Sequence, residues 1–319
     1  MKVVARFCAL ALAGILSAGV QAETRTVAIT QIVEHPALDA CRTGVRDELA
    51  AQGYKEGENL RWIYENAQGN PATAAQIAKK FAGEQPDVIV AITTPSAQTV
   101  AASVRGIPVV FAAVTDPVGA KLVESLDKPG KLITGTTDML PLERHLELVK
   151  RVVPGVKRIG TLYNPGEANS VSLVKRLKSV ASAQELEVVE AVATKTSEIL
   201  NAAKSLVGKV DAIYLLTDNT VISAVEAVIQ VGERNKLPVI AADTDTVKRG
   251  AVAAYGFNYY DVGRQTGKIV ARILKGESPA NIPVQGVEKL ELYVNPKAAE
   301  RMGITLDESL IKEAKAVVE

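Results

Sequence analysis

Small hydroxyl and amide side chains lie where they could bind an anion. Thr93, Thr94, Ser96 and Gln98 closely follow residues 88–92, an apolar run typical of a strand buried on both faces of a sheet. Pro95 favours the first turn of a helix that begins there. Free backbone N–H groups at a helix N-terminus bind carboxylates and phosphates, and the nearby hydroxyl groups could bond the same anion. Alternatively, Thr94 or Ser96 caps its own helix.

A second stretch repeats this pattern. Residues 212–216 are predicted to form a buried strand, and the polar residues Thr217, Asp218 and Asn219 follow it before an apolar helical run. In open α/β sheets, ligands bind outside the carboxyl ends of the strands. The repeat therefore predicts two similar lobes with a small molecule buried between them.

Carboxylates end the next predicted strand in both stretches. Thr115 and Asp116 follow the strand after the first stretch, and Asp243 follows the strand after the second. A ligand with an ammonium group would bind one of these carboxylates or Asp218. Asp116 could instead be no more than a turn former before a proline.

Two further polar loops are expected at the same sheet edges. Each follows a predicted strand and precedes a predicted helix. Their candidate ligand-binding residues are Glu34 and His35 in the first loop, and Asn164, Asn169 and Ser170 in the second. His35 could equally be a solvated loop residue, and Asn169 or Ser170 could simply cap the next helix.

The sequence lacks the short motifs of dinucleotide sites, phosphate loops, serine hydrolases and zinc proteases. Its two histidines are His35 and His145, and neither has other metal ligands at close spacing. We expect His145 to be solvated or partly packed on a helix. The groups that converge are Ser, Thr, Asn, Gln and Asp, which suit recognition better than bond breaking. An enzyme that uses paired carboxylates remains an alternative.

The N-terminus is typical of a secretory signal peptide. Lys2 and Arg6 flank the start of an apolar run that is too short to span a bilayer and ends in a small-residue cleavage pattern. We therefore expect residues 1–22 to be removed on export. The full sequence has 37 basic residues, including Lys2 and Arg6, and 36 acidic residues. The mature chain is therefore nearly neutral and is not expected to bind nucleic acid. Cys41 is then the one remaining cysteine, and we interpret it as a small core residue.

The alternation of predicted strands and helices indicates an α/β fold with two doubly wound parallel-sheet lobes joined by a three-crossover hinge. We expect residues 23–138 and 257–283 to form the N-terminal lobe, and residues 139–256 and 284–319 to form the C-terminal lobe. A helix at residues 261–275 should pack back on the N-terminal lobe. A terminal amphipathic helix is expected with one face formed by Leu310, Ile311, Ala314 and Val317.

Several segments resemble the ABC-transporter substrate-binding protein family of the type I periplasmic binding fold, in the branch associated with tryptophan and tyrosine uptake. The matching segments are residues 29–39, 66–69, 94–98, 111–120, 163–170, 218–220 and 256–267. The resemblance implies a monomeric periplasmic receptor without a cofactor. Such a receptor closes on an amino acid, here an aromatic one (Trp, Tyr or Phe), and delivers it to the membrane permease of an ABC transporter.

The resemblance also implies roles for the candidate residues. The ligand carboxylate is expected at Ser96, Ala97 and Gln98, with Thr94 and, from the facing lobe, Asn169 and Ser170. The ammonium group is expected at Asp116, Asp218 or Asp243, with Asp218 favoured. The rest of the pocket is expected to include Glu34, Thr115, Asn164 and Asn219, and the ligand side chain should lie near His35, Tyr163 or Tyr255.

Other functions stay open. A sensory receptor of the same fold would report a ligand rather than transport it, although no DNA-binding segment precedes the first predicted lobe. Ureas, sugars and peptides are alternative solutes. Permease and ATPase genes beside this one would separate transport from sensing.

Overall fold

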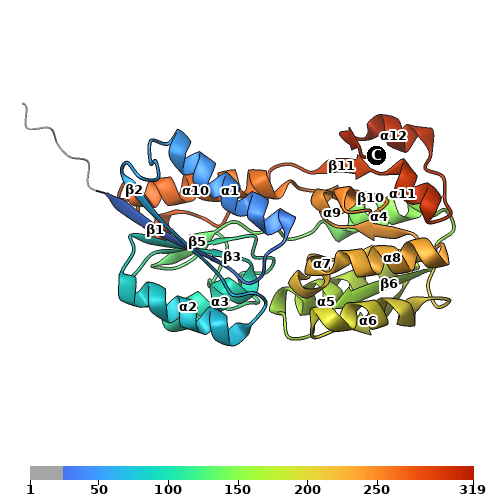
Figure 1. The fold of residues 1–319 in the computed structure, drawn as a ribbon, viewed down its shortest axis with the longest axis horizontal. Helices are drawn as coiled ribbons and strands as arrows, with labels where there is room; N and C mark the ends of the chain where they lie inside the picture. The colour runs from blue at the N-terminus through green and yellow to red at the C-terminus, as the bar shows by residue number, and fades with distance from the viewer. Residues whose placement is uncertain (1–23) are drawn as a thin grey trace, which may run out of the picture.

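The computed structural model describes residues 24–319, which form two α/β lobes side by side (Figure 1). The predicted signal peptide, residues 1–22, lies outside the described residues. Within residues 24–319, none of the helices is both long and apolar enough to span a membrane.

The first lobe is built on a parallel sheet with the strand order β2-β1-β3-β4-β5. Its strands are β1 (Arg25–Gln31), β2 (Leu60–Asn66), β3 (Val88–Ile92), β4 (Val109–Ala112) and β5 (Ile133–Gly135). All five side chains of β3 are buried, as its apolar run predicts. Val88, Val90 and Ile92 pack on one side of the sheet, whereas Ile89 and Ala91 pack on the other.

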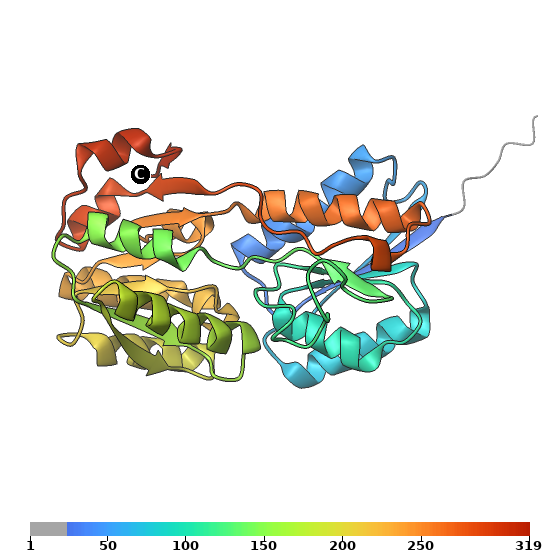
Figure 2. The same ribbon diagram turned by 180° about the vertical axis from the view of Figure 1, so that it is seen from behind.

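Helices cover both faces of this sheet (Figures 1 and 2). On one face α1 packs beside α10, and on the other α2 packs beside α3. These helices are α1 (Pro36–Ala51), α2 (Pro71–Glu84), α3 (Thr94–Ser103) and α10 (Tyr259–Leu274). The chain reaches α10 only after it has built most of the second lobe, so α10 packs back on the first lobe as predicted.

Glycines allow α1 and α10 to approach closely. A Cβ atom on Gly263 of α10 would lie 2.0 Å from the backbone oxygen of Cys41, and one on Gly44 of α1 would lie 2.2 Å from that of Tyr260. Both distances are far shorter than a van der Waals contact. Cys41 is fully buried at this crossing, which confirms that it is a small core residue.

The second lobe is built on a sheet with the strand order β12-β11-β10-β9-β8-β6-β7, in which only β11 runs antiparallel to its neighbour β10 among the described strands. Its strands are β6 (Arg158–Tyr163), β7 (Glu187–Val192), β8 (Ala212–Leu215), β9 (Val239–Ala241), β10 (Ala253–Gly256), β11 (Glu291–Val294) and β12 (Ala316–Val317). Its helices are α4 (Leu142–Val152), α5 (Ala168–Ala183), α6 (Ile199–Leu206), α7 (Asn219–Ser223), α8 (Val225–Asn235), α9 (Thr244–Lys248), α11 (Pro296–Arg301) and α12 (Glu308–Glu313). The chain passes between the two sheets after β5, after β10 and after α10.

Three local predictions were wrong. The last helix ends at Glu313, and Val317 lies in β12, because the end of the chain pairs with the free edge of β11. The helix expected at residue 261 begins at Tyr259, because the Asn258 side chain caps it through the Tyr260 N–H. The apolar run after Asn219 forms the two helices α7 and α8 rather than one.

Candidate functional site

A cavity lies where both sheets change their direction of winding. In the first sheet this point falls between β1 and β3, and in the second between β6 and β8. Such points are the usual ligand sites of open α/β sheets. The cavity is small, with about 20 Å³ open to the centre of a water molecule, and its lining residues are His35, Ala37, Leu38, Thr93, Thr94, Ala113, Thr115, Asp138, Asn169, Thr217, Asp218, Asn219, Ile222, Asp243 and Tyr259.

The structure brings together half of the residues that the sequence singled out. The predicted residues that line the cavity are His35, Thr94, Thr115, Asn169, Asp218, Asn219 and Asp243. The predicted residues outside its lining are Glu34, Ser96, Ala97, Gln98, Asp116, Asn164 and Ser170. The two predicted stacking partners Tyr163 and Tyr255 also lie outside the lining, so the rings that face the cavity are His35 and Tyr259.

Several polar atoms of the residues that line the cavity have no hydrogen-bond partner. His35 Nδ1, Thr93 Oγ1, Thr94 Oγ1, Asn169 Oδ1 and Thr217 Oγ1 are buried, and within residues 24–319 they have no hydrogen-bond partner. Buried polar atoms are nearly always paired in folded proteins, so this concentration calls for an explanation. A ligand with several hydrogen-bonding groups would satisfy these atoms together.

The backbone at the start of α3 is strained. Thr93, which precedes this helix, has φ +77°, a backbone conformation that residues other than glycine rarely adopt. Ala113, which also lines the cavity, has φ +53°. Strain of this kind costs about 1–3 kcal/mol and is concentrated at functional sites. Here it holds the Thr93 and Thr94 hydroxyl groups at the helix N-terminus.

Three buried carboxylates line the same cavity. Asp138 accepts hydrogen bonds from Thr115 Oγ1 (2.8 Å) and Tyr259 OH (2.9 Å), and Asp243 accepts two from Thr246. Burial raises the pKa of both Asp138 and Asp243. A cation between these carboxylates would stabilise their ionised form. In the part of the chain that the structure describes, no cluster of His, Cys, Asp and Glu is arranged to hold a metal ion.

Asp218 is the most heavily bonded of the three. It accepts hydrogen bonds from the N–H groups of Asn164 (2.7 Å) and Val221 (2.8 Å) and from Ser170 Oγ (2.6 Å). Burial and the nearby Glu167 carboxylate raise its pKa to about 7. Asn164 and Ser170 therefore serve the cavity indirectly, because they hold the carboxylate that lines it.

Asn169 presents an acceptor to the cavity. Its Nδ2 donates to the Thr217 carbonyl oxygen (3.0 Å) and to Glu167 Oε2 (3.3 Å), which leaves Oδ1 as the unpaired atom. This orientation suits an N–H group of a ligand rather than the carboxylate expected there.

The remaining predicted residues have other surroundings. Glu34 is exposed, Ser96 and Ala97 are buried within α3, and Gln98 donates from Nε2 to the Ala120 carbonyl oxygen (3.1 Å). Asp116 accepts a hydrogen bond from Ser172 Oγ of α5 (2.9 Å), which joins the two lobes.

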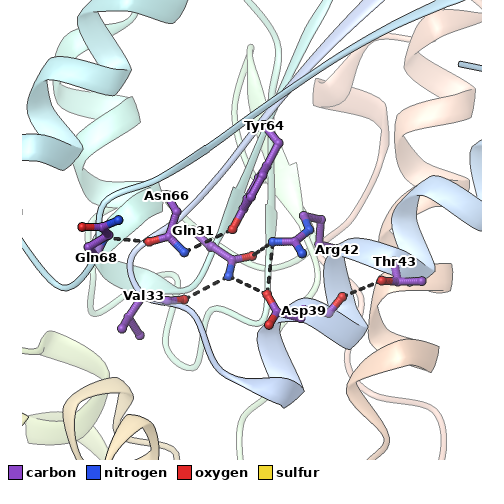
Figure 3. Close-up of polar contacts among 8 residues, drawn as sticks. All are labelled: Gln31, Val33, Asp39, Arg42, Thr43, Tyr64, Asn66 and Gln68. Atoms are coloured by element: carbon purple, nitrogen blue, oxygen red, sulfur yellow. Dashed lines mark hydrogen bonds and ion pairs between the residues drawn. The ribbon is translucent and has the colours of Figure 1, made fainter. Parts of the chain in front are cut away.

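A wider pocket of about 470 Å³ adjoins the cavity at Asn219 and is lined by both lobes. Its first-lobe wall includes Val33 and Gln68, which a hydrogen-bonded network at the end of β1 and β2 supports (Figure 3). In this network Gln31 Nε2 donates to the Val33 carbonyl oxygen (3.1 Å) and to Asp39 Oδ1 (2.9 Å). The loop between β1 and α1 is thereby fixed.

Sequence reasoning named Thr93 among the hydroxyl groups at this helix start but did not select Thr217, Asp138 or Tyr259 as ligand-binding residues. Thr217 could have been found, because it is the first polar residue after the buried strand of the second repeated stretch. Asp138 and Tyr259 lie close to places where the chain passes between lobes, and their meeting through a hydrogen bond depends on the three-dimensional path.

Comparison with known proteins identifies the family. The family model described as ABC transporter substrate binding protein matches residues 26–318. The chain belongs to this family. It is 41% identical over 271 residues to a "Tyrosine-binding protein" of Clostridioides difficile, covering 85% of this chain and 79% of that protein. The resemblance noted in the sequence is thus confirmed, and the family is one of solute-binding proteins rather than enzymes.

Solved structures support the same fold and bear on its conformation. A Streptococcus pneumonia ABC domain in complex with L-Trp is 35% identical with a TM-score of 0.89, covering 93% of this chain and all of that one. A ligand-free, open substrate-binding protein from Clostridium difficile is 40% identical but has a TM-score of 0.70, covering 92% of this chain and 99% of that one. The lobes of this chain are thus arranged more like those of the L-Trp complex. The predicted two-lobed type I periplasmic binding fold is confirmed.

Proposed function

We propose that this protein is the periplasmic solute-binding component of an ABC importer and binds an aromatic L-amino acid in the cavity between its lobes. The main observation is the set of unpaired buried polar atoms that faces three carboxylates across one small cavity. The relatives named for tyrosine and solved with L-Trp support an aromatic amino acid as the ligand. The partner is the membrane permease of the transporter.

The carboxylate of the ligand binds at the start of α3 in this proposal. Thr93 Oγ1 and Thr94 Oγ1 are unpaired donors there, and the helix dipole favours a negative charge at this end. Ala97 and Gln98 contribute by forming the first turns of the helix rather than by side-chain contact.

The ammonium group binds among the three carboxylates. Asp138 and Asp243 each accept two hydrogen bonds in the ligand-free protein, whereas Asp218 accepts three. An ammonium group has three N–H donors, so the carboxylates with more free lone pairs suit it better. We therefore assign direct contact to Asp138, Asp243 and the Asn169 amide oxygen, with Asp218 as a third source of negative charge.

A ligand screen tests the function. Protein refolded to remove carried-over ligand is heated with each amino acid, with sugars and with nucleosides. A ligand at a hundred times its Kd should add about 2.7 kcal/mol to the free energy of unfolding, which raises Tm by several degrees. We expect a rise with aromatic amino acids. A rise only with sugars or nucleosides, or none with any amino acid, would refute the proposal.

The carboxylate assignment is tested with Asp138→Asn, Asp243→Asn and Asp218→Asn, measured by calorimetric titration. The exposed Asp127→Asn serves as the control with the same chemical change outside the cavity. We expect Asp138→Asn and Asp243→Asn to weaken binding at least tenfold, about 1.4 kcal/mol, and Asp218→Asn to weaken it less. The largest loss with Asp218→Asn would restore the sequence-based preference for that residue.

A further inference from the structure

The His35 imidazole is a buried polar group that neither end of an amino acid explains. Its side chain lines the cavity, and the residue is only 7% exposed. Nδ1 is fully enclosed and has no hydrogen-bond partner anywhere in residues 24–319. A buried nitrogen left unpaired costs free energy, which a ligand atom placed against it would recover.

The ring is neutral. Burial and the positive charge of Arg249 lower the pKa of His35 to about 3. Arg249 keeps its position through hydrogen bonds to Glu226 (2.7 and 2.8 Å) and to the Ile222 carbonyl oxygen (2.7 Å). Because the imidazole carries no charge near pH 7, one of its ring nitrogens is a hydrogen-bond acceptor that needs no anionic partner. It can therefore pair with a neutral O–H or N–H donor of a ligand.

A hydrogen-bonded network that Figure 3 draws links Gln31, Val33, Asp39 and Arg42, which lie before and after His35 in the chain. Gln31 binds the Val33 carbonyl oxygen, and Arg42 binds both Gln31 Oε1 and Asp39 Oδ1 at 3.1 Å. The Asp39 N–H in turn donates to the His35 carbonyl oxygen at 3.1 Å. His35 therefore lies between two anchored residues, which fixes its backbone beside the cavity.

We propose that His35 determines which aromatic amino acid binds, because its Nδ1 accepts a hydrogen bond from a donor carried on the ligand ring. The donor is a phenolic hydroxyl or an indole N–H, and the imidazole proton is then on Nε2. The inference rests on the proposed function and deepens it. The hydroxyl groups of Thr93 and Thr94 and the three carboxylates bind the charged ends of the ligand. His35 is then available to contact the side chain of the ligand. A ligand ring without a donor leaves Nδ1 buried and unpaired, so the site discriminates against phenylalanine.

The test compares the Kd values of tyrosine, tryptophan and phenylalanine by calorimetric titration of the protein freed of carried-over ligand. We expect the unmodified protein to bind tyrosine or tryptophan at least tenfold more tightly than phenylalanine. The variant His35→Phe should reduce that ratio to less than about threefold, because it removes the acceptor. The variant His35→Gln retains an acceptor oxygen and should keep most of the ratio.

The chain offers a matched control in its other histidine. His145 is buried in the second lobe, contrary to the solvated or partly packed position expected from the sequence. It lies outside the cavity lining, and its Nδ1 lies 2.6 Å from Tyr214 OH. His145→Phe should lower Tm and leave the ratio unchanged, which separates specificity from general destabilisation. A ligand-side measurement does not depend on any variant folding. 4-Fluoro-L-phenylalanine is close to tyrosine in size but has no donor, and it should bind the unmodified protein like phenylalanine.

Each outcome decides between the two proposals. Binding of aromatic amino acids without a preference for ring donors, or an unchanged ratio in His35→Phe, would overturn the role of His35 and leave the proposed function intact. Tyrosine-like binding of the fluorinated ligand would also overturn it. Binding of no aromatic amino acid would overturn the proposed function itself, and the role of His35 with it.

Discussion

The Thr94 hydroxyl group should lower the stability of the ligand-free protein and raise its affinity for the ligand. Thr94 Oγ1 is buried and unpaired within the described chain. Thr94→Val removes the hydroxyl at nearly constant shape, so we expect it to stabilise the ligand-free protein by about 1 kcal/mol. The same change should weaken amino-acid binding about tenfold. Urea unfolding and calorimetric titration measure the two effects.

Thr134 provides the matched control for this change. Its buried Oγ1 donates to the Ile282 carbonyl oxygen at 2.7 Å, away from the cavity. Thr134→Val should therefore destabilise the protein by about 1 kcal/mol and leave ligand affinity unchanged. If both variants lose stability equally, the Thr94 hydroxyl group is not an unpaired group that awaits a ligand.

The His145 side chain should make stability depend on pH. Burial lowers its pKa to about 4, whereas an unfolded histidine has a pKa of 6.5. Below pH 6.5 the unfolded state binds the proton more readily, so the contribution of His145 to stability is complete above pH 6.5 and falls as the pH falls toward 4. The loss reaches about 3 kcal/mol at pH 4.

Comparison with His145→Gln isolates this effect from the other groups. His35 acts in the same direction, and the raised pKa of Asp218 acts in the opposite direction. We expect the stability advantage of the unmodified protein over His145→Gln to shrink steadily between pH 7 and pH 4 in urea unfolding. A constant difference would show that His145 does not titrate in this range.

The residue types predicted that the site is polar better than they predicted which residues line it. Polar residues just after apolar runs identified His35, Thr94 and Asp218, because the carboxyl ends of parallel strands meet at one edge. Gln98, also expected at the ligand carboxylate, lies outside the cavity lining, because a helix start fixes where the backbone points but not where the next turn packs. Asp138 depended on the path of the chain between the lobes.

At the scale of elements, the crossing of α1 and α10 should tolerate no added atom. Gly263→Ala places a Cβ atom where the Cys41 carbonyl oxygen lies, and neither backbone can retreat from the close-packed helix pair. We expect a loss of at least about 2 kcal/mol in the free energy of unfolding. Chemical denaturation measures it.

Gly83 is the control for this substitution. It lies in α2, and a Cβ atom there would have open space around it. Gly83→Ala should stabilise the protein by up to about 1 kcal/mol, because alanine is the better helix former. A loss of stability in both variants would point to a general intolerance of alanine rather than to the helix crossing.

The order of elements was largely predictable, and their ends were not. Apolar runs such as residues 88–92 identify buried strands without ambiguity, and Pro36 and Gly53 mark the limits of α1. By contrast, β12 has only two residues, and their strand conformation comes from pairing with β11 rather than from their own sequence. Pairing between distant segments leaves no local signal.

At the scale of the molecule, the hydrogen bond between Asp116 and Ser172 should favour the closed arrangement. It joins the loop after β4 to α5 across the cleft at 2.9 Å. Ser172→Ala should weaken ligand binding by up to about fivefold, since closure contributes to affinity and a single hydrogen bond contributes about 1 kcal/mol. Calorimetric titration, with X-ray scattering of the ligand-free protein, measures both consequences.

Ser179→Ala on the exposed side of the same helix is the control. It should change neither affinity nor scattering. Equal effects of the two variants would assign the change to the helix rather than to the contact between lobes.

The return of α10 to the first lobe also constrains the order in which the protein can fold. α10 covers a face of the first sheet and contacts α1 (Figure 2), yet it follows about 120 residues of the second lobe in the chain. A chain that has emerged only as far as β10 has every strand of its first sheet but lacks the helix that shields it. The first lobe therefore cannot complete its core before the second is nearly synthesised, which delays folding until the polypeptide is almost whole. Such a delay would suit the proposed export, because it would leave the chain unfolded for longer.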